Sequence, residues 1–236
     1  MENEHFLISQ NRIEIDGRKI KNKEAYTLIK QKPNKKILGF WPLYLNFYNL
    51  AAKKNQDHYF KKIGEPPTIF NYRLARKSAL QIELYYKNKG YLDAKTSFEI
   101  DKKRHKVKVI YTLNKGLAYK INEVNINSDL NGHYTEIIKS ITSKIRKGRS
   151  FKLNYLEQLR SNIASKIQND GYYQFNKEFI YFMADTNYQK KEIDLELGVK
   201  PVEKIQDEKV VKSDHKIGFI ERINVHLDII TSKSIN

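Results

Sequence analysis

Histidines and carboxylates are the residues of this chain that could hold a metal or transfer a proton. The 236 residues include six His and 27 Asp and Glu. No two histidines share an i, i+4 spacing, and no HExxH, phosphate-binding glycine loop or nucleophile elbow occurs. The acidic residues lie on alternating strand positions beside lysines, as in KKEIDLEL, which is typical of a solvent-exposed strand face. We therefore expect no metal, no cofactor and no enzymatic activity.

The overall charge leaves binding functions open. Lys and Arg number 44 against 27 Asp and Glu, a net charge of +17, which attracts polyanions and anionic membrane surfaces. A basic nucleic-acid-binding protein is therefore an alternative, although the basic residues are scattered and no helix-turn-helix, RNP or zinc-finger pattern occurs. There is no cysteine, no signal peptide and no apolar run long enough for a spanning helix. If the native protein is exported, we expect its targeting segment to be missing from this chain.

An internal repeat organises the chain. Gly90-Tyr91 and Gly171-Tyr172 lie 81 residues apart, each after a stretch with helical spacing of apolar positions. Each glycine stands where a left-handed helix cap is needed, and Asn71 is a candidate N-cap of the first helix. At this offset one helix face aligns with the other: Ala75, Ser78, Ile82 and Tyr86 with Leu156, Leu159, Ile163 and Ile167.

Strands with alternating burial surround these helices. Val107, Val109 and Tyr111 alternate with polar residues, as do Ile193, Leu195 and Leu197. Residues 91–100 and 172–182 also favour extended structure, so each unit is expected to end in a hairpin. Short strands at NRIEI, NEVNI and ERINV begin each unit, and Tyr134, Ile137, Ile138, Ile141 and Ile145 predict a further helix. The pattern is β-α-α-β-β, present twice, with residues 202–216 as a linker or extended loop before a third first strand.

Four segments carry a family resemblance: KQKPNKKILGFWPLYLNFYNL, KKIGEPPTIFN, YYKNKGYLDAK and NDGYYQFNKEFIYFMADT. With the tandem unit, they resemble the polypeptide-transport-associated (POTRA) modules of the BamA/TamA outer-membrane assembly family, in its TamA-like lipoprotein (TamL) branch. The resemblance implies an α+β fold of tandem POTRA modules, each a small three-stranded mixed sheet with two helices on one face. We expect module 1 at residues 1–116 with an aromatic-rich insertion at about 32–69, module 2 at 117–200, and a linker with the first strand of a truncated third module at 201–236.

The resemblance also implies a function. In its strand order the second strand of each module lies at a sheet edge, where unpaired backbone groups can accept an extended peptide. The residues expected to bind clients or partners there are Tyr91, Ala94, Phe98, Tyr172, Tyr173, Phe175, Phe179 and Tyr181. The alternative is that the inward members of this set only fill the core, and Gly90 and Gly171 are expected to be structural caps.

The segment ILGFWPLYLNFY in the insertion is the second candidate contact. Its aromatic residues suit a membrane interface or a partner subunit, and the neighbouring lysines would favour anionic headgroups. The alternative is a packed subdomain that covers the sheet or the helices. The residues concerned are Phe40, Trp41, Tyr44, Phe47 and Tyr48.

Location and partners follow from the resemblance alone. It implies a periplasmic region attached to the outer membrane in the full-length protein and soluble as this fragment. The expected partners are unfolded outer-membrane proteins, accessory assembly subunits and a C-terminal membrane β-barrel of the same native chain. An anionic membrane surface is a further possible partner, whereas nucleic acid belongs to the alternative function.

Overall fold

The fold was obtained as a computed structural model that describes residues 6–34, 66–128, 130, 132–206, 208–219 and 221–224. The chain divides into two compact units, which we treat separately. Unit 1 comprises Met1–Lys120, Ser150–Asn154 and Asn187–Glu192, and unit 2 comprises Ile121–Arg149, Tyr155–Thr186 and Ile193–Asn236.

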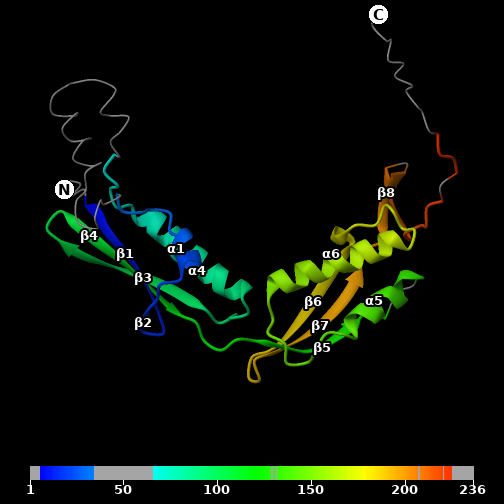
Figure 1. The fold of residues 1–236 in the computed structure, drawn as a ribbon, viewed down its shortest axis with the longest axis horizontal. Coiled ribbons are helices and arrows are strands. Elements are labelled where there is room, and N and C mark those ends of the chain that lie inside the picture. Colours follow the sequence, from blue (N-terminus) through cyan, green and yellow to red (C-terminus); the bar gives the residue numbers. More distant parts are fainter. Residues whose placement is uncertain are drawn as a thin grey trace, which may run out of the picture. The chain divides into compact units, whose positions relative to one another are not determined.

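Unit 1 is a four-stranded mixed sheet with helices on one face (Figure 1). The strand order is β2-β1-β4-β3; β1 is parallel to β4, while β3 is antiparallel to β4 and β2 to β1. Strand β3 therefore lies at an edge, as expected for the second strand of the module. The elements are β1 (Leu7–Ile15), β2 (Arg18–Lys19), α1 (Lys23–Thr27), α4 (Tyr72–Asn88), β3 (Lys95–Lys103) and β4 (Lys106–Asn114).

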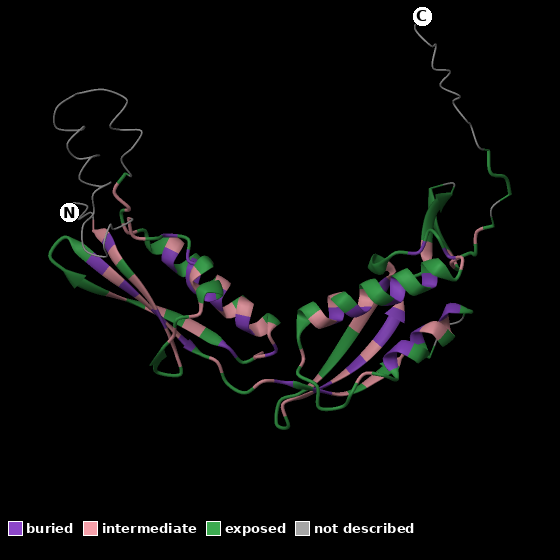
Figure 2. Cartoon of the chain, in the orientation of Figure 1, coloured by how far each residue is buried: buried purple, intermediate pink, exposed green. Residues whose placement is uncertain are grey.

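The core of unit 1 lies between α4 and the central strand β4. Every second residue of β4 is buried, from Val107 to Leu113, which confirms the predicted alternation. On α4 the buried face is the predicted one, with Ala79 in addition, and Figure 2 shows its exposed outer face. Burial of an aliphatic side chain such as Ile82 stabilises the fold by about 1.5–3 kcal/mol.

Unit 2 repeats this topology with the strand order β5-β7-β6, so that β6 is an edge strand. Its core joins the buried faces of both helices to β6 and β7 and includes Ile138, Ile163 and Leu197, each 0% exposed. The α+β fold with two β-α-α-β-β units is therefore confirmed. The elements are β5 (Lys120–Ile126), α5 (Tyr134–Thr142), α6 (Leu153–Asn169), η1 (Lys177–Phe179), β6 (Ile180–Asn187) and β7 (Glu192–Val199).

Both long helices end in the same Schellman motif. Gly90 has φ +96° and Gly171 has φ +99°, as predicted for left-handed caps. In α4 the Tyr91 N–H donates to the Tyr86 carbonyl and the Gly90 N–H to the Lys87 carbonyl. The N–H groups of Tyr172 and Gly171 make the equivalent bonds after α6, to the carbonyls of Ile167 and Gln168. At the other end of α4, the Asn71 side chain accepts from the Arg73 and Leu74 N–H groups, so the predicted N-cap is confirmed.

The edge strands begin later than expected. Residues 91–94 form a turn closed by a bond from the Ala94 N–H to the Tyr91 carbonyl, and β3 starts at Lys95. After α6, the Phe175 N–H donates to the Tyr172 carbonyl, and the 3₁₀ turn η1 follows before β6 starts at Ile180. The prediction of extended chain directly after each glycine was wrong, because these segments first complete the helix caps.

The C-terminal part also differs from the prediction. Instead of a linker or loop, Val202–Gln206 (β8) and Lys209–Ser213 (β9) form an antiparallel hairpin. No strand occurs among residues 214–219 and 221–224, and the rest of the expected third-module strand lies outside the described residues.

Candidate functional site

The outer edge of β3 is the candidate binding feature of unit 1. No described strand pairs with this edge. In an antiparallel pair, alternate residues direct their backbone N–H and C=O groups away from the partner strand. The Thr96 N–H points outward, since it donates to Glu83 Oε2 at 2.9 Å. By the same alternation Phe98, Ile100 and Lys102 present their backbone groups to the open side.

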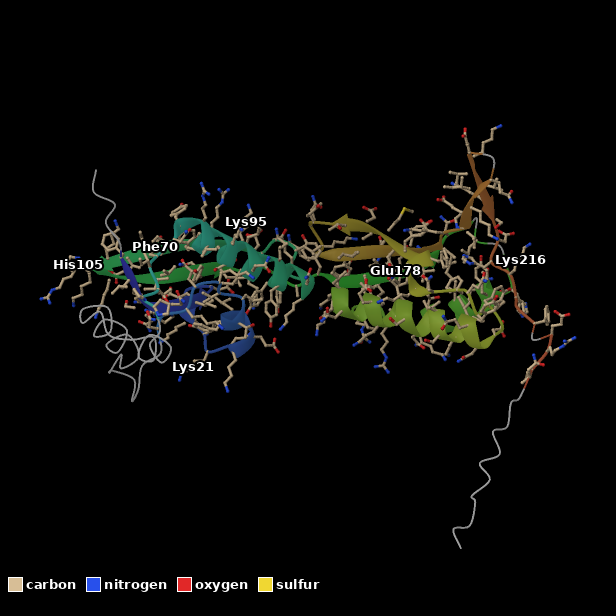
Figure 3. All side chains as sticks on the ribbon, turned by 90° about the horizontal axis from the view of Figure 1, so that it is seen from above. Lys21, Phe70, Lys95, His105, Glu178 and Lys216 are labelled. Carbon is tan, nitrogen blue, oxygen red and sulfur yellow. The ribbon has the colours of Figure 1, made fainter. Side chains whose placement is uncertain are left out.

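A groove accompanies this edge along the exposed side of α4. It has a volume of about 830 Å³ and lies between the helix and the first residues of β3. Figure 3 shows that Lys95 and His105 mark the start of β3 and the tip of the β3–β4 hairpin. The residues that line the groove are Tyr72, Arg73, Arg76, Lys77, Ala79, Leu80, Glu83, Thr96, Ser97 and Phe98.

The apolar part of the groove is formed by aromatic and aliphatic side chains. The rings of Tyr72 and Phe98 contact each other with centroids 5.1 Å apart. Tyr72 is 64% exposed and Leu80 is 52% exposed, so both present apolar surface to the groove. An extended chain beside β3 would find both backbone partners and apolar contacts here.

The charges of the groove are unevenly distributed. Arg73, Arg76 and Lys77 are exposed, and none forms an ion pair within the part of the chain that the structure describes. Glu83, by contrast, binds Lys87 Nζ at 2.7 Å. Burial raises the pKa of the Glu83 carboxyl, but the bonds from Lys87 and the Thr96 N–H outweigh it, and the pKa is lowered. Glu83 is therefore negatively charged at neutral pH and closes the edge at Thr96.

Among the predicted binding residues of unit 1, only Phe98 lines this groove. Tyr91 is half-buried in the turn before β3, and Ala94 is 0% exposed in the core. Gly90 caps α4 as predicted, and its position tolerates no side chain, because a Cβ would lie 2.0 Å from the Phe151 carbonyl oxygen.

In unit 2 the predicted residues separate into core and surface. Tyr172 and Phe175 are 5% and 1% exposed and belong to the core. Phe179 is half-buried before β6, Tyr181 is half-buried within it, and Tyr173 is 66% exposed. Tyr181 also lines a pocket of about 370 Å³ together with Asn127, Leu130, Tyr134, Val199, Pro201, Asp214 and His215.

The predicted aromatic contact in the insertion cannot be placed on the fold. Phe40, Trp41, Tyr44, Phe47 and Tyr48 all lie outside the described residues. In the described part, no group of three His, Cys, Asp or Glu side chains is arranged to hold a metal ion. Nor does any described helix have the length and apolarity needed to cross a membrane.

Sequence reasoning missed the cations of the groove. It interpreted runs of basic residues as solvated faces and did not single out Arg73, Arg76 and Lys77. The repeat contained a usable signal. The equivalent positions 81 residues later are Asn154, Glu157 and Gln158, so the three basic residues are present in the first copy alone.

Comparison with known proteins identifies a family for the N-terminal part of the chain. Residues 9–116 match the POTRA family, described as surface antigen variable number repeat. POTRA domains are non-enzymatic, and the match therefore confirms for these residues the expectation that they are not an enzyme. No curated protein matches the chain.

Several solved structures are similar at low identity. POTRA3-5 of Haemophilus influenzae BamA is 17% identical with a TM-score of 0.44, over 83% of this chain and 66% of that chain. BamA from Haemophilus ducreyi lacking POTRA domains 1-3 is 14% identical with a TM-score of 0.40, over 83% of this chain and 29% of that chain. POTRA1-3 of Omp85 from Anabaena is 11% identical with a TM-score of 0.40, over 82% of this chain and 61% of that chain.

This chain thus spans 66% or less of the length of each of these three. The family match and the topology that both units share lead to one conclusion: residues 9–116 match the POTRA family, and the chain has an α+β fold of tandem POTRA-like modules.

Proposed function

We propose that this chain is the periplasmic POTRA region of an outer-membrane protein assembly or translocation factor of the BamA/TamA type, in the TamA-like lipoprotein branch. In this role it binds partner subunits and extended segments of unfolded client proteins. The POTRA match over residues 9–116 and the four sequence segments that resemble this family support the proposal.

The mechanism that the geometry favours is the addition of a peptide strand to the outer edge of β3. Phe98 and Ile100 offer backbone donors and acceptors there, and Tyr72 and Leu80 offer apolar contacts to alternate side chains. Backbone pairing depends little on sequence, which suits a protein that handles many unfolded clients. The open edge of β3 with its adjoining groove is the observation that carries the proposal.

Strand β6 offers a second edge with a different environment. Met183 on β6 is 50% exposed, and Tyr181 is half-buried beside it. A peptide added to β6 would therefore bind mainly through its backbone, and we expect weaker binding than at β3.

The test uses fluorescent ten-residue peptides with alternating apolar residues, and fluorescence anisotropy with the whole chain. Ile100→Pro removes an N–H that faces the open edge, without removing a bond to β4, and should weaken binding at least tenfold. Peptides that are N-methylated at even or at odd positions provide a matched pair, because only one set of amides can face β3.

Two results would contradict strand addition at β3. One is equal affinity of the two N-methylated peptides, and the other is unchanged affinity of a folded Ile100→Pro variant. An oligonucleotide that binds more tightly than any peptide, with a steep salt dependence, would favour the nucleic-acid alternative instead.

A further inference from the structure

We propose that the groove of unit 1 selects extended segments that carry Asp or Glu at alternate positions, so that the acidic side chains meet Arg73, Arg76 and Lys77. This inference rests on the proposed function, since it requires a strand added to β3. It goes beyond that function because it assigns a chemical preference to one of the two modules.

The direction of the groove follows from two contacts. Phe98 packs against Tyr72 near the start of α4, whereas Thr96 is bonded to Glu83 more than two turns further along the helix. Strand β3 therefore runs opposite to α4. A strand added outside β3 would direct every second side chain toward the exposed face of α4.

The three cations share that helix face. Arg73 and Lys77 are one helical turn apart, and Arg76 lies one turn before Leu80, so the cations lie between the apolar groups of Tyr72 and Leu80 along the groove. A bound segment with carboxylates at every second or fourth residue would match this spacing.

These cations also oppose the electrostatics of their own helix. They lie within the first six residues of α4, whose first turn contains no acidic residue. The N-terminal end of a helix carries partial positive charge, so cations there lower helix stability slightly, whereas an anion bound from outside relieves the repulsion. The effect is confined to the first turn and so applies mainly to Arg73, and an anionic side chain bound beside it would be favoured.

Glu83 limits where the acidic residues can bind. Its carboxylate occupies the outward N–H of Thr96 at 2.9 Å and would repel a second carboxylate at that end. The acidic residues of the ligand should therefore lie beyond Thr96, opposite the N-terminal half of α4.

A peptide fits this groove better than a nucleic acid does. The exposed apolar groups of Tyr72 and Leu80 lie beside outward backbone groups of β3, and this combination pairs with an extended polypeptide. Unit 2 lacks the charge pattern, because its equivalent positions are Asn154, Glu157 and Gln158, and Glu157 is bound to Arg160 at 2.8 Å.

The experiment compares peptides that are identical except for Asp and Glu, or Asn and Gln, at alternate positions. They are titrated against the chain and against the variant Arg73→Asn, Arg76→Glu, Lys77→Gln, which gives unit 1 the residues of unit 2. A control variant, Lys144→Gln, Arg146→Glu, Lys147→Asn, makes the same change in net charge at exposed positions of unit 2.

We expect the acidic peptide to bind about tenfold more tightly than the amide peptide at low salt, from ion pairs of modest individual strength. The preference should fall toward unity near 1 M salt, because exposed charges are screened. It should be lost in the groove variant and kept in the control variant.

The remaining outcomes are distinguishable. Equal binding of both peptides, with an effect of backbone N-methylation still present, overturns the acidic preference and leaves strand addition intact. Absence of binding by either peptide overturns both. A preference that both triple variants lose equally also overturns the inference, because it would come from net charge alone. Displacement of the bound peptide by a short oligonucleotide would show instead that the cations bind nucleic acid.

Discussion

The two units share the same backbone fold and differ in the residues on their surfaces. In both, four equivalent positions of the long helix are buried, a Schellman motif ends it, and the second strand lies at a sheet edge. The exposed helix faces diverge: the groove cations of unit 1 have no ion-pair partner among the described residues, whereas Arg160 in unit 2 binds Glu157 and Glu178. Packing constrains the four shared buried positions, whereas the exposed face is free to acquire different binding properties.

The test of this comparison with the largest expected effect concerns the equivalent core residues. Ile82 and Ile163 are both 0% exposed, so replacement of either by alanine removes buried methyl groups and leaves a cavity. Each variant should lose about 2–5 kcal/mol of unfolding free energy in its own unit. Urea unfolding monitored by hydrogen exchange measures this loss, because hydrogen exchange reports the stability of each unit separately. Equal destabilisation of both units by one substitution would show that they do not unfold independently.

A second test separates the two caps. Gly90→Ala should cost more than Gly171→Ala, because the new Cβ would lie 2.0 Å from the backbone oxygen of Phe151 in the first case. In the second it would lie 2.9 Å from the Ile217 side chain, which can move. We expect about 3 kcal/mol or more for Gly90→Ala and about 1–2 kcal/mol for Gly171→Ala.

Gly148→Ala is the matched control for the caps. Gly148 has φ +79°, and a Cβ there would have no neighbour within 4 Å, so its variant measures the conformational cost alone. If thermal unfolding shows the same loss for Gly90→Ala and Gly148→Ala, the contact with Phe151 has no energetic importance.

The repeat explains why much of this fold was predictable. Helical spacing with a glycine 81 residues apart fixes two buried faces and two caps, and burial leaves few alternatives at Ile82 or Ile163. Strand alternation likewise identified β4 and β7. These features depend on local pattern, which a single sequence contains.

The rest depends on contacts between distant segments. The sequence does not reveal that Tyr172 and Phe175 turn into the core before β6 begins. It gives little sign of the β8–β9 hairpin, where Ile205 and Val210 are 80% and 60% exposed, so that burial imposes no pattern on it. Likewise, the groove cations acquire a role only when β3 is placed beside α4.

A third, smaller test compares two arginines on the long helices. Arg160 pairs with Glu157 and Glu178 and donates to the Lys177 carbonyl, whereas Arg76 has no ion pair among the described residues. Arg160→Met should cost about 1 kcal/mol, and Arg76→Met should change stability by less than about 0.5 kcal/mol. Denaturant midpoints at low and high salt measure both. A clear loss in Arg76→Met would mean that this cation stabilises unit 1 rather than serving a ligand.

The smallest effect concerns acid sensitivity at Asp93. Its Oδ2 binds Lys191 Nζ at 2.8 Å, and both carboxylate oxygens lie 3.1 Å from the Tyr119 hydroxyl, all within unit 1. The bond from Lys191 lowers the pKa of the Asp93 carboxyl against the opposing effect of burial, and the Tyr119 hydroxyl adds to the lowering. The equivalent position in unit 2 is Gln174, which does not titrate.

Because this pKa is lower in the folded than in the unfolded chain, the interaction contributes its full stability above the unfolded value of about 3.9. That contribution disappears as the pH falls through the folded value. Asp93→Asn should therefore be less stable than the parent chain at pH 6, and the two should converge toward pH 3. Urea unfolding of both proteins from pH 6 to pH 3 measures the difference, and a gap that stays constant with pH would show that Asp93 acts through its shape and hydrogen bonds rather than its charge.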